Sequence, residues 1–423
     1  MSGNTVRSVT ACRVCGSERW QKVLSFGNVP LANAFLEAGD TEALAREQAY
    51  PLEVISCREC RLLSLTAVVD PQVLYRTYSY VTSDSETMAR HMRTVVRLCG
   101  EQVELAEGDL VVELGSNTGE QLMAFREAGA RVLGVDPARN LAEIAEQRGV
   151  PTVPEYFDSA CAESIVAEHG RASVILGRHV FAHIDDVADV LAGVHALLAP
   201  DGLFTIEVPY AVDLLDGLAF DTVYHEHLSY FLISTLDTLF ARHGLRTVDV
   251  ERLPVHGGSV LVSAGPADGP HPTGERVREL MAHERAAGFL SDARYEDFAA
   301  RVQKTCADLS HLVRDLAADG HRIAGYGASA KGTTLLNICG LGLGELEFCT
   351  DTTPQKQGRL TPGTHLPVLA PGDVGEQPDY YLLLAWNYAE EIMRKESAFL
   401  EAGGGFIVPV PEPSVRTRAV SRR

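Results

Sequence analysis

The stretch VVELGSNTGEQL, residues 111 to 122, joins an apolar run to a helical pattern through a glycine-containing loop. Gly115 and Gly119 allow a tight turn and a close approach of the backbone to a ligand, as in nucleotide-binding loops. Asp136 ends the next apolar run, where a carboxylate can accept hydrogen bonds from both hydroxyls of a ribose. An ordinary strand-to-helix turn is the alternative for the loop alone; together with Asp136 it predicts an α/β domain that binds a nucleotide-type cofactor.

Further apolar runs alternate with helical patterns after this loop. Such alternation indicates a mostly parallel, doubly wound sheet, and the last two runs, on either side of Gly257-Gly258, indicate an antiparallel closing pair. Pro154 weakens the third run as a strand, because proline donates no ladder hydrogen bond. The predicted strands span residues 109–115, 132–136, 153–157, 174–176, 203–208, 245–250 and 259–263.

A second, smaller α/β sheet is predicted beyond the Gly/Pro-rich stretch 264–273, which has the composition of a domain boundary. A charged helical stretch over 275–318 precedes this sheet. Its predicted strands span 322–327, 346–350, 380–385 and 406–410. Because 423 residues exceed a single hydrophobic core, we predict three domains, over residues 1–73, 74–267 and 268–423.

Two cysteine pairs, Cys12-Arg-Val-Cys15 and Cys57-Arg-Glu-Cys60, lie in the first segment. Two such turns can offer four thiolates to one tetrahedral Zn²⁺ ion. Chance pairs of buried thiols and a redox disulfide are the alternatives. We predict a zinc-binding domain that stabilises the fold and does no catalysis, because four sulfurs leave no open position on the metal.

The composition is that of a soluble globular protein, with 46% apolar and 22% charged residues. A net charge of −20 would repel a nucleic-acid backbone or an anionic membrane surface. The chain has neither a signal-peptide pattern nor an apolar stretch long enough to cross a bilayer. We therefore expect a cytoplasmic protein, a monomer or small homo-oligomer, without a nucleic-acid or membrane partner.

Glu113 and Asn117 distinguish between the possible cofactors. A dehydrogenase would use Asp136 in the same way, but its loop expects glycine where this chain has Asn117, and a carboxylate at Glu113 would repel a pyrophosphate. The carboxylate suits a positively charged cofactor, S-adenosylmethionine. The predicted cofactor-binding residues are Glu113, Gly115, Asn117, Gly119, Asp136 and Pro137, with Tyr156 and Phe157 around the adenine and Ser83 and Ser85 at the methionine end.

Five motifs together resemble the three-domain sugar C-methyltransferases, which methylate carbon 3 of nucleotide-linked keto-deoxysugars in antibiotic-sugar biosynthesis. They are the cysteine pairs, the loop VVELGSNTGEQL, RHVFAHIDD (178–186), YHEHLSYF (224–231) and GYGASAKG (325–332). The resemblance implies a zinc-binding domain, a Rossmann-like class I S-adenosylmethionine methyltransferase domain, and a smaller Rossmann-like carboxy-terminal domain that helps to hold the sugar nucleotide. The family's catalytic cluster falls here on Tyr78, His183, Tyr224, Glu226 and His227.

The chemistry of carbon methylation explains such a cluster. Carbon becomes a nucleophile when a proton next to a carbonyl is removed and the resulting enolate is stabilised. A neutral histidine can take that proton near pH 7, and we assign His227 as the base. On a helical turn Tyr224 would share its face and, with His183, stabilise the enolate oxygen. Tyr78 lies in a segment, residues 75–88, that we expect to fold over the site; a linker with packed tyrosines is the alternative.

GYGASAKG follows a predicted strand and opens a helix, so its backbone amides, Ser329 and Lys331 favour phosphate oxygens. It differs from a Walker loop, which has GK[ST] after four residues. A structural turn without a ligand is the alternative. The predicted substrate-binding residues are Gly327, Ser329, Lys331, Asn387 and His225.

The sequence thus predicts methyl transfer from S-adenosylmethionine to carbon 3 of a dTDP-linked 4-keto-deoxysugar through an enolate. An O- or N-methyltransferase on the same fold would not need the enolate machinery. A nicotinamide-dependent sugar-nucleotide dehydrogenase would use both Rossmann-like turns, and a zinc-ribbon adaptor would use only the first segment.

Overall fold

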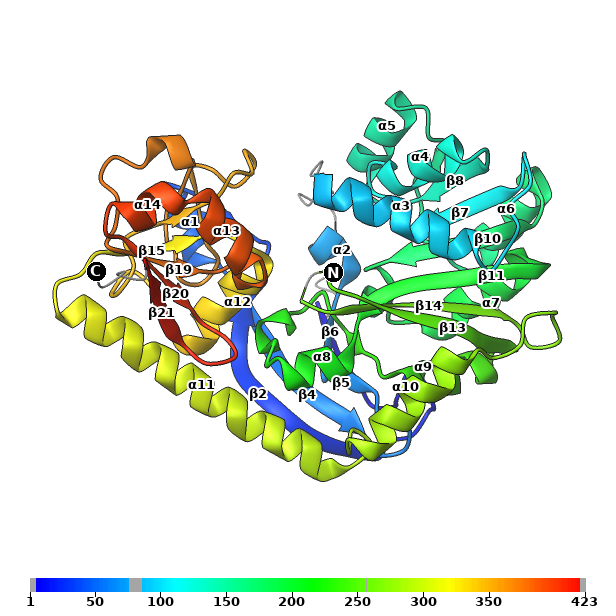
Figure 1. Cartoon of the computed structure of the whole chain (residues 1–423), viewed down its shortest axis with the longest axis horizontal. Helices are drawn as coiled ribbons and strands as arrows, with labels where there is room; N and C mark the ends of the chain where they lie inside the picture. Colours follow the sequence, from blue (N-terminus) through cyan, green and yellow to red (C-terminus); the bar gives the residue numbers. More distant parts are fainter. Residues whose placement is uncertain (1–4, 76–85, 256, 419–423) are drawn as a thin grey trace, which may run out of the picture.

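The structure is a computed structural model that describes residues 5–75, 86–255 and 257–418. Two α/β lobes lie on opposite sides of the view in Figure 1, and β2 (Trp20–Pro30) and α11 (Asp292–Ala318) run along the lower side of the molecule. No helix within the described ranges is long and apolar enough to cross a membrane.

The larger lobe contains a seven-stranded sheet with the order β13-β14-β11-β10-β7-β8-β9. Strands β11, β10, β7, β8 and β9 pair in parallel, whereas β14 pairs antiparallel with β11 and β13. The strands are β7 (Leu110–Leu114), β8 (Arg131–Val135), β9 (Thr152–Val153), β10 (Ala172–Arg178), β11 (Leu198–Pro209), β13 (Leu245–Leu253) and β14 (Ser259–Pro266). All five residues of β7 are buried, as expected for a central strand covered on both faces.

This sheet confirms the predicted parallel arrangement and its antiparallel closing pair. The predicted third strand, 153–157, is wrong beyond Val153, because Pro154 ends the pairing with β8. The accompanying helices are α3 (Glu86–Gly100), α4 (Glu120–Glu127), α5 (Arg139–Gln147), α6 (Ser159–His169), α7 (Val187–Leu197), α8 (Ala211–Asp216), α9 (Ile233–Arg242) and α10 (Glu275–Ala286), with the 3₁₀ turns η1 (Phe181–His183) and η2 (Phe220–Thr222).

The amino-terminal segment forms an antiparallel four-stranded sheet with the order β12-β5-β4-β2. Besides β2 it contains β4 (Ala49–Cys57), β5 (Leu63–Leu65) and β12 (Ser229–Tyr230). Strand β12 belongs to the YHEHLSYF stretch, so the amino-terminal sheet holds the chain directly after His227. The remaining elements of this segment are β1 (Val6–Ser8), β6 (Ala67–Val69), β3 (Leu36–Glu37), α1 (Thr41–Ala45) and α2 (Pro71–Tyr75).

The smaller lobe contains a six-stranded sheet with the order β18-β16-β15-β19-β20-β21. Its strands are β15 (Ile323–Tyr326), β16 (Cys349–Thr350), β18 (Val368–Leu369), β19 (Tyr380–Leu383), β20 (Gly405–Val408) and β21 (Ser414–Thr417). The four predicted strands are confirmed with fewer residues than predicted, and the last of them, β20, begins one residue earlier than predicted. Strand β17 (Arg359–Leu360) pairs with β3 and so connects this lobe to the amino-terminal segment.

The helices of the smaller lobe are α12 (Ala330–Cys339), α13 (Ala389–Lys395) and α14 (Ser397–Glu401), with the turns η3 (Pro371–Asp373) and η4 (Trp386–Tyr388). The predicted helical stretch 275–318 consists of α10 and α11. Helix α10 packs against α9 and β13 of the larger lobe, whereas α11 packs against β2, α8 and α12. Thus α11 contacts all three parts of the chain.

Candidate functional site

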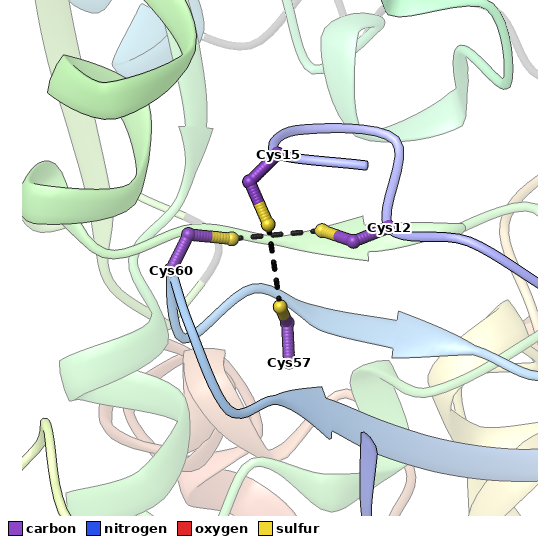
Figure 2. Close-up of side chains that lie close together, drawn as sticks. All are labelled: Cys12, Cys15, Cys57 and Cys60. Atoms are coloured by element: carbon purple, nitrogen blue, oxygen red, sulfur yellow. Dashed lines mark hydrogen bonds between the residues drawn. The ribbon is translucent and has the colours of Figure 1, made fainter. Parts of the chain in front are cut away.

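Four cysteine sulfurs converge in the amino-terminal segment, and Figure 2 shows them pointing toward a common centre. The Sγ atoms of Cys12 and Cys60 lie 3.5 Å apart, as do those of Cys15 and Cys57, and all four lie within 4.8 Å of one another. Tetrahedral Zn–S bonds of about 2.3 Å would place the sulfurs about 3.8 Å apart. The donor set therefore fits a structural zinc ion.

The glycine loop lies at the carboxyl end of β7, as predicted. Gly115 has φ 67°, and a Cβ atom there would lie 2.9 Å from the Val180 side chain, so only glycine fits. Asp136 holds the loop: its Oδ2 accepts from the Asn117 N–H at 2.8 Å and its Oδ1 from the Ala138 N–H at 2.9 Å. Each carboxylate oxygen has a second lone pair, so Asp136 can still accept from a ribose.

Glu113 lies in β7 with its side chain fully buried. Among the described residues its Oε2 atom has no hydrogen-bond partner. Burial raises the pKa of Glu113 to about 8, against the opposing effect of the nearby Arg178 guanidinium. A nearby positive charge favours the ionised form of a buried carboxyl group, so this unpartnered side chain at the ligand-binding edge of the sheet fits a cationic cofactor.

The other predicted cofactor residues have different surroundings, and three of them lie outside the described residues. Phe157 packs against the core, next to Gly193, and Tyr156 is 51% exposed; neither ends a strand. Pro137 is half-buried beside Asp136, and Gly119, with φ 84°, is the N-cap of α4. Tyr78, Ser83 and Ser85 lie outside the described residues.

A buried carboxylate, Glu207, lies beside this region and was not predicted. Its Oε2 accepts from Arg178 Nε at 3.0 Å and lies 2.9 Å from His91 Nε2, and its Oε1 lies 3.3 Å from His179 Nε2. Burial alone would raise the pKa of Glu207, but His179, His91 and Arg178 hold it well below its usual value. In the sequence, the only sign of this cluster is that Arg178, His179 and Glu207 lie at or just after the ends of two predicted strands.

His227 lies at the end of a tight turn closed by a hydrogen bond from its N–H to the carbonyl of Tyr224 at 2.9 Å. The predicted helical turn is therefore wrong, because the chain leaves directly into β12, but the two side chains still meet. His227 Nδ1 donates to the Thr222 carbonyl at 2.8 Å, and its Nε2 lies 2.9 Å from the Tyr224 hydroxyl. Burial, followed by the neighbouring His183, lowers the pKa of His227 well below its ordinary value.

His183 completes this group from η1, and its ring centroid lies 5.0 Å from that of His227. Burial, followed by His179, lowers the pKa of His183 to about 4. Both imidazoles are therefore neutral at pH 7. The structure brings together His183, Tyr224 and His227 in one cluster, in which His227 is buried and His183 and Tyr224 are half-buried.

Glu226 and His225 point toward the amino-terminal segment. Asn33 Nδ2 donates to Glu226 Oε1 at 2.6 Å, and His225 Nε2 lies 3.2 Å from the Tyr50 carbonyl. Glu226 and His225 are 5% and 2% exposed, so both are buried between domains. Asn33 was not predicted, because no local pattern marks a lone asparagine as a partner.

The second glycine loop repeats the arrangement of the first. Asp351, after β16, accepts from the Ala328 N–H at 2.8 Å, as Asp136 accepts from Asn117. Gly327 has φ 86°, and Ser329 is the N-cap of α12, accepting from the Gly332 N–H and donating to the Leu384 carbonyl. The hydroxyl of Ser329 thus already makes hydrogen bonds within the protein, as the N-cap of α12. Its role as a phosphate ligand stays a prediction.

Lys331 and Asn387 lie together at the edge of the smaller lobe. A Cβ atom at Gly257, in the larger lobe, would lie 3.7 Å from Lys331 Nζ and 4.0 Å from the Asn387 side chain. A cavity of about 420 Å³ adjoins this point and is lined by Asp213, Arg252, Leu253, Pro254, Gly257 and Gly258. Lys331 and Arg252, the latter paired with Asp213, therefore lie where the lobes meet.

Three protein-family models match three successive segments of the chain. Residues 12–75 match a family described as "Putative zinc binding domain", 86–250 one described as "Methyltransferase domain", and 254–411 one described as "C-methyltransferase C-terminal domain". The chain is 52% identical over 411 residues to C-methyltransferase NovU of Streptomyces niveus, covering 97% of each protein.

More distant similarities cover only part of the chain. It is 23% identical to the uncharacterized methyltransferase YcgJ of Bacillus subtilis, over 50% of this chain and 83% of YcgJ. A structural similarity to the PH0226 protein of Pyrococcus horikoshii covers 46% of this chain and 98% of that one, with 14% identity and a TM-score of 0.35.

Proposed function

This chain belongs to the three-domain C-methyltransferases, and we propose that its reaction adds a methyl group to carbon 3 of a dTDP-linked 4-keto-deoxysugar through an enolate. The product would serve the biosynthesis of an antibiotic sugar. The observation that carries the proposal is the hydrogen bonding of His227, which presents one basic nitrogen to a phenol in a buried site.

The cofactors of this C-methyltransferase are S-adenosylmethionine and structural zinc. S-adenosylmethionine, when bound, supplies an electrophilic methyl group. We assign Gly115 and Asn117 to the backbone cradle of this cofactor, Asp136 to its ribose and Glu113 to its positive charge. The supporting observations are the glycine-only geometry at Gly115 and the buried, unpartnered Oε2 atom of Glu113.

His227 is the proposed base for the carbon-3 proton. Because Nδ1 donates its proton to the Thr222 carbonyl, the lone pair of the neutral ring lies on Nε2. Because burial lowers the pKa of His227 well below its ordinary value, that lone pair carries no proton at pH 7. His227 Nε2 is therefore the atom that takes the proton next to the ketone.

Tyr224 and His183 are the proposed partners of the enolate oxygen. The Tyr224 hydroxyl lies 2.9 Å from His227 Nε2, so a substrate that reaches the base also reaches the phenol. Both donors are half-buried, and donors held in fixed positions stabilise a developing oxyanion more than freely reorienting water does. His183, 5.0 Å away between ring centroids, is the second donor.

The smaller lobe is the proposed holder of the nucleotide diphosphate. Lys331, Asn387 and the cavity beside Gly257 and Arg252 lie where this lobe meets the larger one. An ammonium and a guanidinium are the side chains that bind phosphate oxygens best.

The test is to locate the transferred methyl group. Incubation with S-adenosylmethionine carrying a ¹³C-labelled methyl and a dTDP-4-keto-deoxysugar should give a product whose labelled methyl is bonded to carbon 3 in the carbon NMR spectrum. Substrate incubated with unlabelled cofactor is the control. A label on a hydroxyl oxygen, on an amine or at another carbon would contradict the proposal.

A further inference from the structure

Asp221, in the turn η2, is a buried carboxylate that the proposed mechanism does not use. Its side chain is fully buried, and Oδ2 accepts a hydrogen bond from Trp386 Nε1 at 2.6 Å. Trp386 lies in η4 of the smaller lobe, so this bond crosses between lobes. The other oxygen, Oδ1, has no hydrogen-bond partner in the described part of the chain. A carboxylate in this state is costly unless a cation faces it.

Lys331 is that cation. Helix α12, which carries Lys331 in its first turn, packs directly on η2. Burial raises the pKa of Asp221 and lowers that of Lys331, and the attraction between the two groups opposes both shifts. Trp386 of the smaller lobe thus donates a hydrogen bond to the Asp221 carboxylate, and Lys331, on the helix that packs on η2, attracts the same carboxylate electrostatically.

The turn that carries Asp221 also fixes the base. The next residue, Thr222, accepts through its carbonyl from His227 Nδ1 at 2.8 Å and from the Tyr230 hydroxyl at 3.2 Å. The position of that carbonyl determines both the ring orientation of His227 and the nitrogen that keeps the lone pair. A shift of η2 would therefore move the base.

We propose that Asp221 is a positioning residue that, through Trp386 and Lys331, fastens the smaller lobe to the turn that orients His227. The inference rests on the proposed role of His227 as the base. It assigns Lys331 a second task besides substrate binding. When the smaller lobe holds the sugar nucleotide, this contact keeps the base in register with the ketone to be deprotonated.

Trp386→Phe and Asp221→Ala test the proposal, singly and together. Each should lower kcat about tenfold to a hundredfold, the range for loss of a hydrogen bond to a buried charged group, with an unchanged KM for S-adenosylmethionine. The double variant should be no slower than the slower single variant, because both changes remove one contact. Tyr381→Phe is the matched control: it removes a 3.0 Å hydrogen bond to Gln377 within the smaller lobe and should keep its kcat.

Equal kcat values for the parent and Trp386→Phe would overturn the proposal. So would losses that multiply in the double variant, or a fall in melting temperature and in cofactor affinity that matches the fall in kcat. If His227→Asn also kept its kcat, the proposed base would be wrong; if only the Asp221 and Trp386 variants kept theirs, the positioning role alone would be wrong.

Discussion

Replacing His227 with asparagine is expected to lower kcat for methyl transfer by about 10²- to 10⁴-fold, the usual contribution of a positioned general base. Asparagine can still donate to the Thr222 carbonyl, but it offers no basic nitrogen to the substrate. Because the His227 side chain is buried, bulk water does not take the place of the imidazole. KM for S-adenosylmethionine should stay unchanged, since His227 does not belong to the glycine loop that we assign to the cofactor. Initial rates at saturating concentrations of both substrates measure the change.

Tyr230→Phe is the matched control for His227→Asn. It removes the second hydrogen bond to the Thr222 carbonyl, 3.2 Å long, in an equally buried position, and leaves the base in place. We expect a kcat within a few-fold of the parent, since one neutral hydrogen bond contributes about 1 kcal/mol. If Tyr230→Phe were as slow as His227→Asn, loss of local packing rather than loss of the base would explain both.

Removing the zinc should have the second large effect, on stability and on turnover together. Structural zinc contributes about 10 to 16 kcal/mol of apparent binding free energy in small zinc-dependent folds, so chelation or Cys12→Ser should lower the melting temperature sharply. Metal content by atomic emission and thermal melting measure this. Cys306→Ser, a change at a partly buried thiol on α11 outside the four-cysteine group, is the control.

Turnover should fall as well, because the zinc turn carries Arg13. Its Nη1 donates to the Leu228 carbonyl at 2.8 Å and to Ser229 Oγ at 2.9 Å, directly after His227, and its Nη2 lies 3.3 Å from Asp185, two residues after His183. Loss of the metal would release these contacts. A folded, zinc-free enzyme with full kcat would contradict this account of the amino-terminal domain.

Local patterns in the sequence were sufficient for much of the fold. The alternation of strands and helices predicted both sheets, and the two cysteine pairs predicted the four-sulfur group that the structure brings together. The predicted strand 153–157 was wrong after Val153, and this error also has a local cause: Pro154 cannot donate a hydrogen bond to the neighbouring strand.

Contacts between domains could not be predicted in this way. Asn33 with Glu226, and Trp386 with Asp221, are 193 and 165 residues apart, and neither pair belongs to a repeating pattern. Glu207 likewise gains its histidine and arginine partners only when α3 and β10 meet at β11. The predicted domain boundaries and the roles of the individual site residues stay predictions for the experiments above.

The exchange of the substrate's carbon-3 proton with solvent tests the central claim most directly, because it isolates proton removal from methyl transfer. The dTDP-4-keto-deoxysugar is incubated in D₂O with enzyme and S-adenosylhomocysteine, and the carbon-3 proton is followed by NMR. We predict that the parent enzyme exchanges this proton and that His227→Asn exchanges it at the rate without enzyme. Exchange by His227→Asn at the rate of the parent enzyme would contradict the account.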